Sequence, residues 1–111
     1  MARKFDRVVV DVTKLASYCL SESHPRGRHK ARVFRSRLGW TVADAETLRL
    51  ALLSGARDQQ DKLQATDVDE FGRRYMLDLD VTTTGGRATI RSAWIVLTGD
   101  DVLRLTSCYV L

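Results

Sequence analysis

The residues best suited to chemistry gather in one segment, His24–Arg37, which reads HPRGRHKARVFRSR. It holds both histidines of the chain, six lysines or arginines, and no acidic residue. Arginine presents a planar fork of N–H donors that fits phosphate and carboxylate groups. Histidine is the usual proton carrier near neutral pH. The segment is therefore suited to holding an anion and to moving a proton beside it.

This positive segment has two interpretations that the residues alone leave open. Like charges on one helix repel each other, so a partner or another part of the chain must neutralise them. In the first interpretation the segment is a solvated helix face, balanced by the acidic stretch Asp58–Glu70. In the second it binds an anion, helped by the positive dipole of a helix that begins near Gly27. The residues assigned to binding nucleic acid or another anion are Arg26, Arg28, His29, Arg32 and Arg35.

Five residues, spread over both halves of the chain, are candidates for cleaving an RNA phosphodiester. That reaction needs a base for the ribose 2′-hydroxyl and cations that stabilise the charge of the phosphorane. Taken singly, each candidate has the plainer interpretation of an ordinary surface or sheet residue. Several of them converging on one sheet face would favour catalysis. The candidates are His24 and Lys30 from the first half, and Arg91, Thr106 and Tyr109 from the second.

Other chemistries find no support in the sequence. It contains no CxxC, HExxH, P-loop, GxGxxG or GxSxG pattern. We expect no metal and no cofactor, because isolated histidines and cysteines make a poor set of metal ligands. Cys19 and Cys108 are far apart in the chain, and we expect both to be small buried apolar residues rather than a disulfide.

Length and composition predict a globular protein with one domain, residues 1–111. The chain has a net charge of +4 and is 44% hydrophobic. No stretch approaches the roughly 20 apolar residues needed to cross a bilayer, so we expect no membrane partner. Asp6 and Asp11 bracket the short apolar run near the N-terminus, which is unlike a signal peptide. A reducing, cytoplasmic location fits best.

Three helices are expected within residues 11–57. Apolar residues recur at spacings of three and four in this region, as they do on the buried face of a helix. Gly39 is placed to end the second helix, and Thr41 to cap the third. A short strand or an extended lead-in at Val8–Asp11 precedes the helices. The predicted helices are Lys14–Leu20, Arg28–Leu38 and Val42–Arg57.

From Phe71 onward the apolar period changes to two, which indicates half-buried strands. The turn Thr84–Gly86 separates a first strand from a second, Arg87–Thr98, and a third follows at Val102–Val110. Strands joined by such short turns must be antiparallel neighbours. The polar stretch Asp58–Glu70 is expected to be an exposed connection. The predicted fold is α+β, with N-terminal helices packed on an antiparallel meander at about residues 71–110.

Several segments together resemble a small bacterial domain family of unknown function, over nearly the whole chain. Its pattern combines a Lys-Leu-x-x-Tyr helix, a His-Pro-x-Gly turn, a Lys-Ala-x-x-Phe helix, a Val-x-x-x-Trp-Ile strand and a Leu-x-Thr-x-Tyr end. The matching segments here are Lys14–Leu20, His24–Gly27, Lys30–Phe34, Ile90–Ile95 and Leu105–Tyr109.

More remotely, the layout resembles the ribonuclease fold of the barnase, EndoU, colicin and RelE-type toxins. The resemblance implies a His or Lys from the helical half, a basic residue from a central strand, and a Ser, Thr or Tyr near the end. His24, Lys30, Arg91, Thr106 and Tyr109 occupy those places. The chain matches the full motif of none of these toxin families.

Two main functional hypotheses follow. The first is a toxin-like, metal-independent endoribonuclease, which acts on RNA and has an acidic antitoxin or immunity protein as its partner. The second is a non-catalytic module that uses the Arg-rich helix to hold an acidic protein or nucleic acid, with affinity that falls as salt rises. A part in a larger assembly is a third alternative.

Overall fold

A five-stranded sheet forms the centre of the structure, a computed structural model that describes residues 5–111. Its strands lie in the order β1-β5-β4-β3-β2. β1 runs parallel to β5, and the other neighbouring pairs are antiparallel. The strands are β1 (Arg7–Val9), β2 (Gln64–Val68), β3 (Gly72–Thr83), β4 (Gly86–Leu97) and β5 (Val102–Val110).

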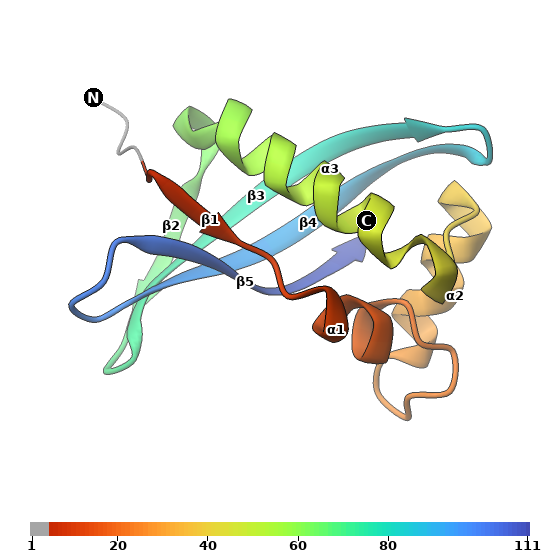
Figure 1. The fold of residues 1–111 in the computed structure, drawn as a ribbon, viewed down its shortest axis with the longest axis horizontal. Helices are drawn as coiled ribbons and strands as arrows, with labels where there is room; N and C mark the ends of the chain where they lie inside the picture. Colours follow the sequence, from red (N-terminus) through yellow and green to blue (C-terminus); the bar gives the residue numbers. More distant parts are fainter. Residues whose placement is uncertain (1–4) are drawn as a thin grey trace.

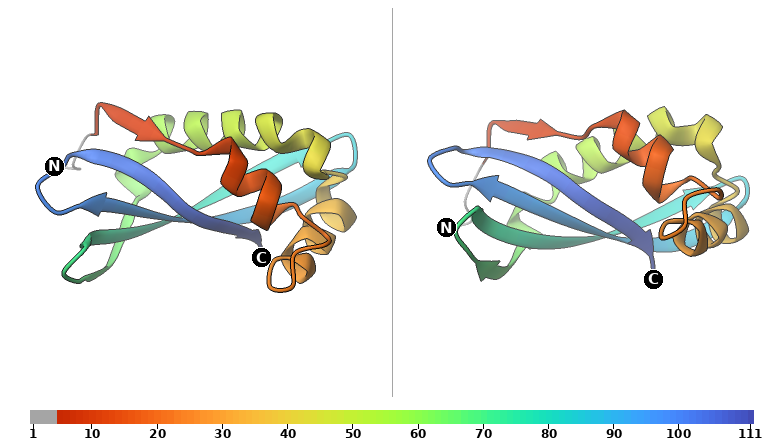
Figure 2. Two further views of the ribbon diagram at one scale, coloured as in Figure 1. Left: turned by 60° about the horizontal axis from the view of Figure 1, so that its bottom comes forward. Right: turned by 90° about the horizontal axis from the view of Figure 1, so that it is seen from below.

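Helical segments cover one face of this sheet, and no helix of residues 5–111 covers the other (Figure 2). α3 lies across the covered face, whereas α2 lies at the end of the sheet that holds the C-terminus (Figure 1). Within the described chain, no helix is both long and apolar enough to span a bilayer. The helices are α1 (Val12–Lys14), the π-helix η1 (Leu15–Cys19), α2 (Arg28–Leu38), the 3₁₀ turn η2 (Val42–Asp44), α3 (Ala45–Asp58) and the 3₁₀ turn η3 (Gln60–Lys62).

The boundary between α2 and α3 follows from two residues that the sequence marks clearly. Gly39 adopts a left-handed conformation (φ 73°), which a residue with a side chain adopts at a cost, and it ends α2. Thr41 and Asp44 then form a capping box, in which the Thr41 N–H donates to the Asp44 carboxylate at 2.9 Å. The predicted helix Arg28–Leu38 and the capping role of Thr41 are confirmed.

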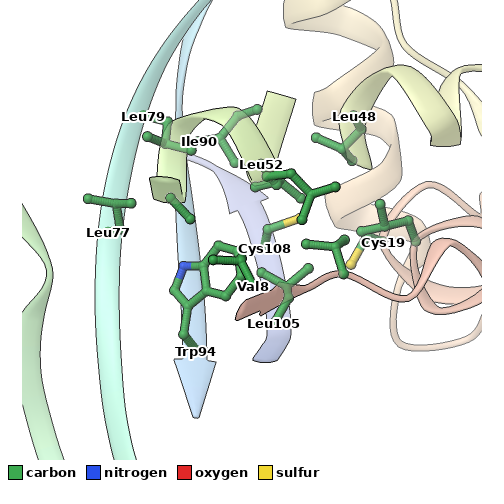
Figure 3. Close-up of a cluster of buried hydrophobic side chains, with 14 of the residues drawn as sticks. Val8, Cys19, Leu48, Leu52, Leu77, Leu79, Ile90, Trp94, Leu105 and Cys108 are labelled. Carbon is green, nitrogen blue, oxygen red and sulfur yellow. The ribbon is translucent and has the colours of Figure 1, made fainter. Parts of the chain in front are cut away.

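The core lies between the helices and the covered face of the sheet (Figure 3). Trp94 is only 1% exposed, and its indole N–H donates to the Ser92 hydroxyl at 2.8 Å. That hydroxyl donates in turn to the Leu77 carbonyl at 2.7 Å, so the buried polar groups are satisfied. Leu77 of β3 and Ile90 of β4 are buried on the same face, as the apolar period of two indicates. Other buried side chains include Leu15, Phe34, Leu38, Leu48, Leu52, Leu79, Ile90 and Leu103.

The α+β fold is confirmed, but the sheet is larger and less uniform than the sequence predicts. The stretch Asp58–Glu70, expected to be an exposed connection, contains η3 and β2. Every residue of β2 is exposed, so no apolar alternation marks it, and pairing with β3 defines it as a strand. The N-terminal strand pairs in parallel with β5, which makes the sheet mixed.

The first and third helices also differ in detail from their predicted ranges. The first begins earlier than Lys14, as one α-helical turn, and continues as the π-helix η1 to Cys19. The third begins as the 3₁₀ turn η2 and becomes α-helical at Ala45. Its core stripe is as predicted, with Leu48 and Leu52 fully buried.

Main-chain contacts hold α2 at both ends. At its start, a Cβ on Gly27 would overlap the carbonyl oxygen of Tyr18. At its other end, a Cβ on Gly85, in the β3–β4 turn, would lie 2.7 Å from the carbonyl oxygen of Leu38. The Thr83 hydroxyl donates to that same Leu38 oxygen at 2.7 Å. The position of α2 against the sheet is therefore fixed by backbone groups as well as by its buried face.

Candidate functional site

The uncovered face of the sheet carries the polar half of the alternating pattern. Ile90 and Trp94 of β4 are buried toward the helices, so Arg91 between them faces the uncovered side. The register places Arg91 opposite Asp78 of β3 and opposite Tyr109 of β5. A guanidinium, a carboxylate and a phenol therefore lie side by side across three strands.

Arg91 is held in a bidentate ion pair. Its Nε and Nη2 atoms each lie 3.0 Å from an oxygen of the Asp78 carboxylate. Asp78 first, and then Tyr109, raise the pKa of the Arg91 guanidinium, and the same ion pair lowers the pKa of Asp78. Both side chains are about one-third exposed. The cation is thus fixed in orientation and still accessible to a ligand on this face.

Lys30 connects α2 to β5 and to the first helical segment. Its Nζ lies 5.1 Å from the centroid of the Tyr109 ring and 5.7 Å from that of Tyr18. These distances are typical of cation–π contacts. None of the ion pairs within residues 5–111 involves Lys30. Its charge is therefore oriented by two aromatic rings and remains uncompensated by an acid.

His24 organises the turn before α2. Its Nδ1 accepts hydrogen bonds from the backbone N–H groups of Arg26 and Gly27, each at 3.0 Å. Because Nδ1 is an acceptor, the proton of the neutral ring is on Nε2. The Nδ1 atom is therefore occupied in holding this turn. Its ring meets that of Tyr18 edge to face, with centroids 4.7 Å apart.

Thr106 lies in the same small hollow as Arg91 and Tyr109, which has a volume of about 180 Å³. Its hydroxyl donates to the Ala93 carbonyl at 3.0 Å, beside the bulge in the β4–β5 pairing. The structure thus brings Lys30, Arg91, Thr106 and Tyr109 together. His24 adjoins this group only through the Tyr18 ring.

The predicted anion-binding arginines lie on a different flank of α2 from Lys30. At about 100° per residue, Arg28, Arg32 and Arg35 fall roughly 140–160° around the helix from Lys30. We call these three residues the arginine stripe. All three are exposed, and so are Arg26 and His29. The stripe is a second positive surface and is not part of the Lys30–Arg91 group.

The acidic stretch Asp58–Glu70 is not seen to balance this stripe. Its ion pair in the described chain joins Asp69 to Arg74, at 2.9 Å. On the stripe, Arg35 is paired with Glu22 of the preceding turn, at 3.2 Å. Arg28 and Arg32 have no acidic partner among residues 5–111. Two guanidinium groups are therefore available for an outside partner.

Cys19 and Cys108 are both free thiols. Both are fully buried, as the sequence predicts. They meet within the core, between η1 and β5 (Figure 3). A hydrogen bond from the Cys108 thiol lowers the pKa of Cys19, whereas that contact and burial raise the pKa of Cys108. Their proximity could not be read from two positions at opposite ends of the chain.

Two participants in the site were not among the sequence candidates. One is Tyr18, whose half-buried ring contacts both His24 and Lys30. The other is Asp78, the ion-pair partner of Arg91. The signal for Asp78 was its place in the alternation of β3, but the cross-strand register was needed to pair it.

This arrangement defines a small α+β protein with a basic and aromatic site on the uncovered face of a mixed sheet. A model of the protein family described as Domain of unknown function (DUF6883) matches residues 2–111. The chain belongs to that family. No curated protein and no solved structure is significantly similar to it.

Proposed function

We propose that the protein is a metal-independent endoribonuclease, and that it works at the uncovered sheet face around Tyr109. The observation that carries this proposal is the contact of Lys30 from α2 with Tyr109 of β5, beside Arg91 of β4. Two cations thus flank one phenol at the place where helix and sheet meet. A phosphate there would meet an uncompensated ammonium, a guanidinium and a hydroxyl donor.

In the proposed reaction, the ribose 2′-oxygen bonds to phosphorus and the bond from phosphorus to the 5′-oxygen breaks. The products are a 2′,3′-cyclic phosphate and a new 5′-hydroxyl. Lys30 and Arg91 stabilise the negative charge that grows on the phosphorane oxygens. The Tyr109 hydroxyl, next to the Arg91 guanidinium, donates to one of those oxygens, and Thr106 borders the hollow that receives them.

Proton transfer has a smaller part in this proposal than charge stabilisation. The His24 Nδ1 atom is occupied by two backbone donors, and the Asp78 carboxylate is bound to Arg91. The 2′-hydroxyl proton therefore passes to solvent water, and water protonates the departing 5′-oxygen. Catalysis then depends on positioning and on fixed positive charge, which are the larger contributions in phosphoryl transfer.

The test is cleavage of several labelled single-stranded RNAs in EDTA, with the products checked for 2′,3′-cyclic phosphate ends. Lys30→Ala and Arg91→Ala should each reduce the cleavage rate by about 10²-fold, the usual effect of removing one stabilising donor. Arg28→Ala is the matched control, because it removes an equal charge from the same helix as Lys30 but from the other flank. Wild-type protein that cuts none of the RNAs, or equal loss in the control, would overturn the proposal.

A second candidate function rests on the arginine stripe, which we propose as a docking surface for an acidic protein. Its support is that Arg28 and Arg32 are exposed, have no acidic partner within residues 5–111, and face away from Lys30. Binding of poly-glutamate, followed by fluorescence anisotropy, should weaken steeply as salt rises. Reversing all three charges (R28E, R32E and R35E together) should abolish it. Unchanged binding by that variant would contradict this candidate.

A further inference from the structure

A groove of about 530 Å³ runs between the first helical segment and the free edge of β5. β1 covers that edge only from Val102 to Arg104, and the groove lies beyond the end of β1. Ligand pockets typically measure about 300–1,000 Å³, so the groove can hold a small organic group. Its lining includes Asp11, Lys14, Ser17, Tyr18, Thr106 and Ser107.

The lining combines an aromatic ring, hydroxyl groups, the Lys14 ammonium and the Asp11 carboxylate, which accepts from the backbone N–H of Thr13 at 2.9 Å. The Ser17 hydroxyl donates to the Thr13 carbonyl at 2.7 Å, which leaves its oxygen as an acceptor toward the groove. Lys14 is exposed and takes part in no ion pair of residues 5–111. An aromatic face can stack on a base, hydroxyls can bond to base or sugar, and an ammonium can pair with phosphate.

The groove and the hollow on the sheet share one lining residue. Thr106 lines both the groove and the hollow that contains Arg91 and Tyr109. The Tyr18 ring, at the groove, shares the Lys30 ammonium with the Tyr109 ring. A nucleic-acid chain whose phosphate lies at Arg91 would therefore reach the groove where that chain crosses β5 at Thr106.

We propose that this groove holds the nucleoside next to the phosphate that is cut, in single-stranded RNA. The inference rests on the proposed function, because it takes the phosphate position from the Lys30–Arg91 group. Because Thr106 lines both the hollow and the groove, the two lie next to each other, as neighbouring phosphate and nucleoside positions require. The base lies against the Tyr18 ring, and the phosphate beyond it meets Lys14.

The experiment uses 2′-O-methyl oligonucleotides five residues long, one for each base, which bind but cannot be cut by 2′-oxygen attack. Binding is measured by fluorescence anisotropy, and the contact by amide chemical shifts in NMR. The largest shifts are expected at Ser17, Thr106 and Ser107. Ser17→Phe fills the groove and should weaken binding about tenfold, the loss expected for one unstacked base.

Ser36→Phe is the matched control, because it adds the same ring to an exposed position of α2 that lines neither the groove nor the hollow. Lys14→Glu, with Lys62→Glu as its control, repeats the test without adding bulk, in case Ser17→Phe does not fold. Lys14→Glu should weaken binding and flatten its salt dependence, whereas Lys62→Glu should change neither.

The outcomes separate this inference from the proposed function. If the wild-type protein cuts RNA and both groove variants bind as the wild type does, the groove inference is wrong and the nuclease proposal stands. If the oligonucleotides shift the groove signals but no RNA is ever cut, the groove is a binding site and the nuclease proposal fails. If no oligonucleotide binds, the groove inference fails, and the cleavage assay alone decides the nuclease proposal.

Discussion

The Lys30 ammonium of α2 lies 5.1 Å from the centroid of the Tyr109 ring of β5. This contact joins the two halves of the chain at the uncovered face of the sheet. It places a cation from the helical half beside Arg91 from the central strand and a phenol from the last strand. The arrangement of charge at this face therefore depends on how α2 docks against the end of the sheet.

Replacing Tyr109 with Phe should separate the role of its hydroxyl from that of its ring. The ring remains available to Lys30, so the free energy of unfolding should change by less than about 1 kcal/mol. Loss of the hydroxyl beside Arg91 should slow RNA cleavage about 10²-fold. Urea unfolding and a cleavage time course measure the two effects. Full activity of Tyr109→Phe would exclude the hydroxyl from the reaction.

Asp78→Asn should lower stability slightly, and only above acidic pH. Arg91 holds the pKa of Asp78 in the folded protein below the ordinary value of 3.8. The ion pair therefore stabilises the folded protein above about pH 3.8. The contribution is lost as pH falls through the lower, folded-state pKa. The pair is partly exposed, so the difference from wild type at pH 7 should be about 0.2–1 kcal/mol. Urea unfolding should show a smaller difference in stability between variant and wild type at pH 3 than at pH 7. A larger difference at pH 3 would contradict the assignment of this stability to the ion pair.

The same substitution frees the Arg91 charge from its carboxylate. RNA should then bind more tightly to Asp78→Asn, and the dependence of its affinity on salt should steepen by about one phosphate contact. Anisotropy titrations at several salt concentrations measure both. Asp80→Asn is a control on the same face, because Asp80 bonds to Thr89 and has no ion pair among residues 5–111. Equal effects of the two variants would show that only general charge on the face matters.

Gly27→Ala should destabilise the protein by about 1–3 kcal/mol, toward the upper end of that range. The added Cβ would overlap the carbonyl oxygen of Tyr18, a backbone atom that cannot rotate away. Gly99→Ala is an informative comparison, because its Cβ would meet nothing within 4 Å but its φ is +82°. That variant should cost about 1 kcal/mol through backbone conformation alone. Thermal and urea unfolding give both values, and a neutral Gly27→Ala would mean that α2 can shift freely.

Ser92→Ala should cost about 1–3 kcal/mol, although it removes a single oxygen. The Ser92 hydroxyl accepts from the Trp94 indole and donates to the Leu77 carbonyl inside the core, and the variant leaves both without that partner. Ser36→Ala, at an exposed position of α2, should change stability by no more than about 0.5 kcal/mol. Equal costs for the two variants would show that the buried bonds contribute little.

Local sequence patterns predicted the elements whose boundaries are set by their own residues. Gly39 ends α2 because its left-handed conformation suits glycine. The alternation of residues in β4 puts Arg91 on the face of the sheet opposite to that of the buried Trp94. β2 was not predicted, because all of its residues are exposed and show no apolar alternation. Its pairing with β3 is what makes it a strand. Patterns of neighbouring residues in the sequence do not predict such pairing.

The sequence predicted the residues of the site better than it predicted how they are arranged in space. The outward position of Arg91 follows from a period of two, which the sequence displays. Its bond to Asp78 and the approach of Lys30 to Tyr109 depend on register and on helix docking. These are long-range contacts that no local spacing encodes. The separation of Lys30 from the arginine stripe does follow from helix geometry, once α2 is known to bury its Ala31, Phe34 and Leu38 face.

The close backbone contacts at Gly27 and Gly85 have a consequence for any inhibitor of the proposed activity. Because α2 is held at both ends, a protein that binds the arginine stripe cannot shift the helix away from Tyr109 without breaking those backbone contacts. Such an inhibitor would have to act by obstruction, extending around the helix to shield the face that carries Lys30 and Arg91. It would leave the geometry of that face unchanged, so any activity there should return in full as soon as the inhibitor dissociates.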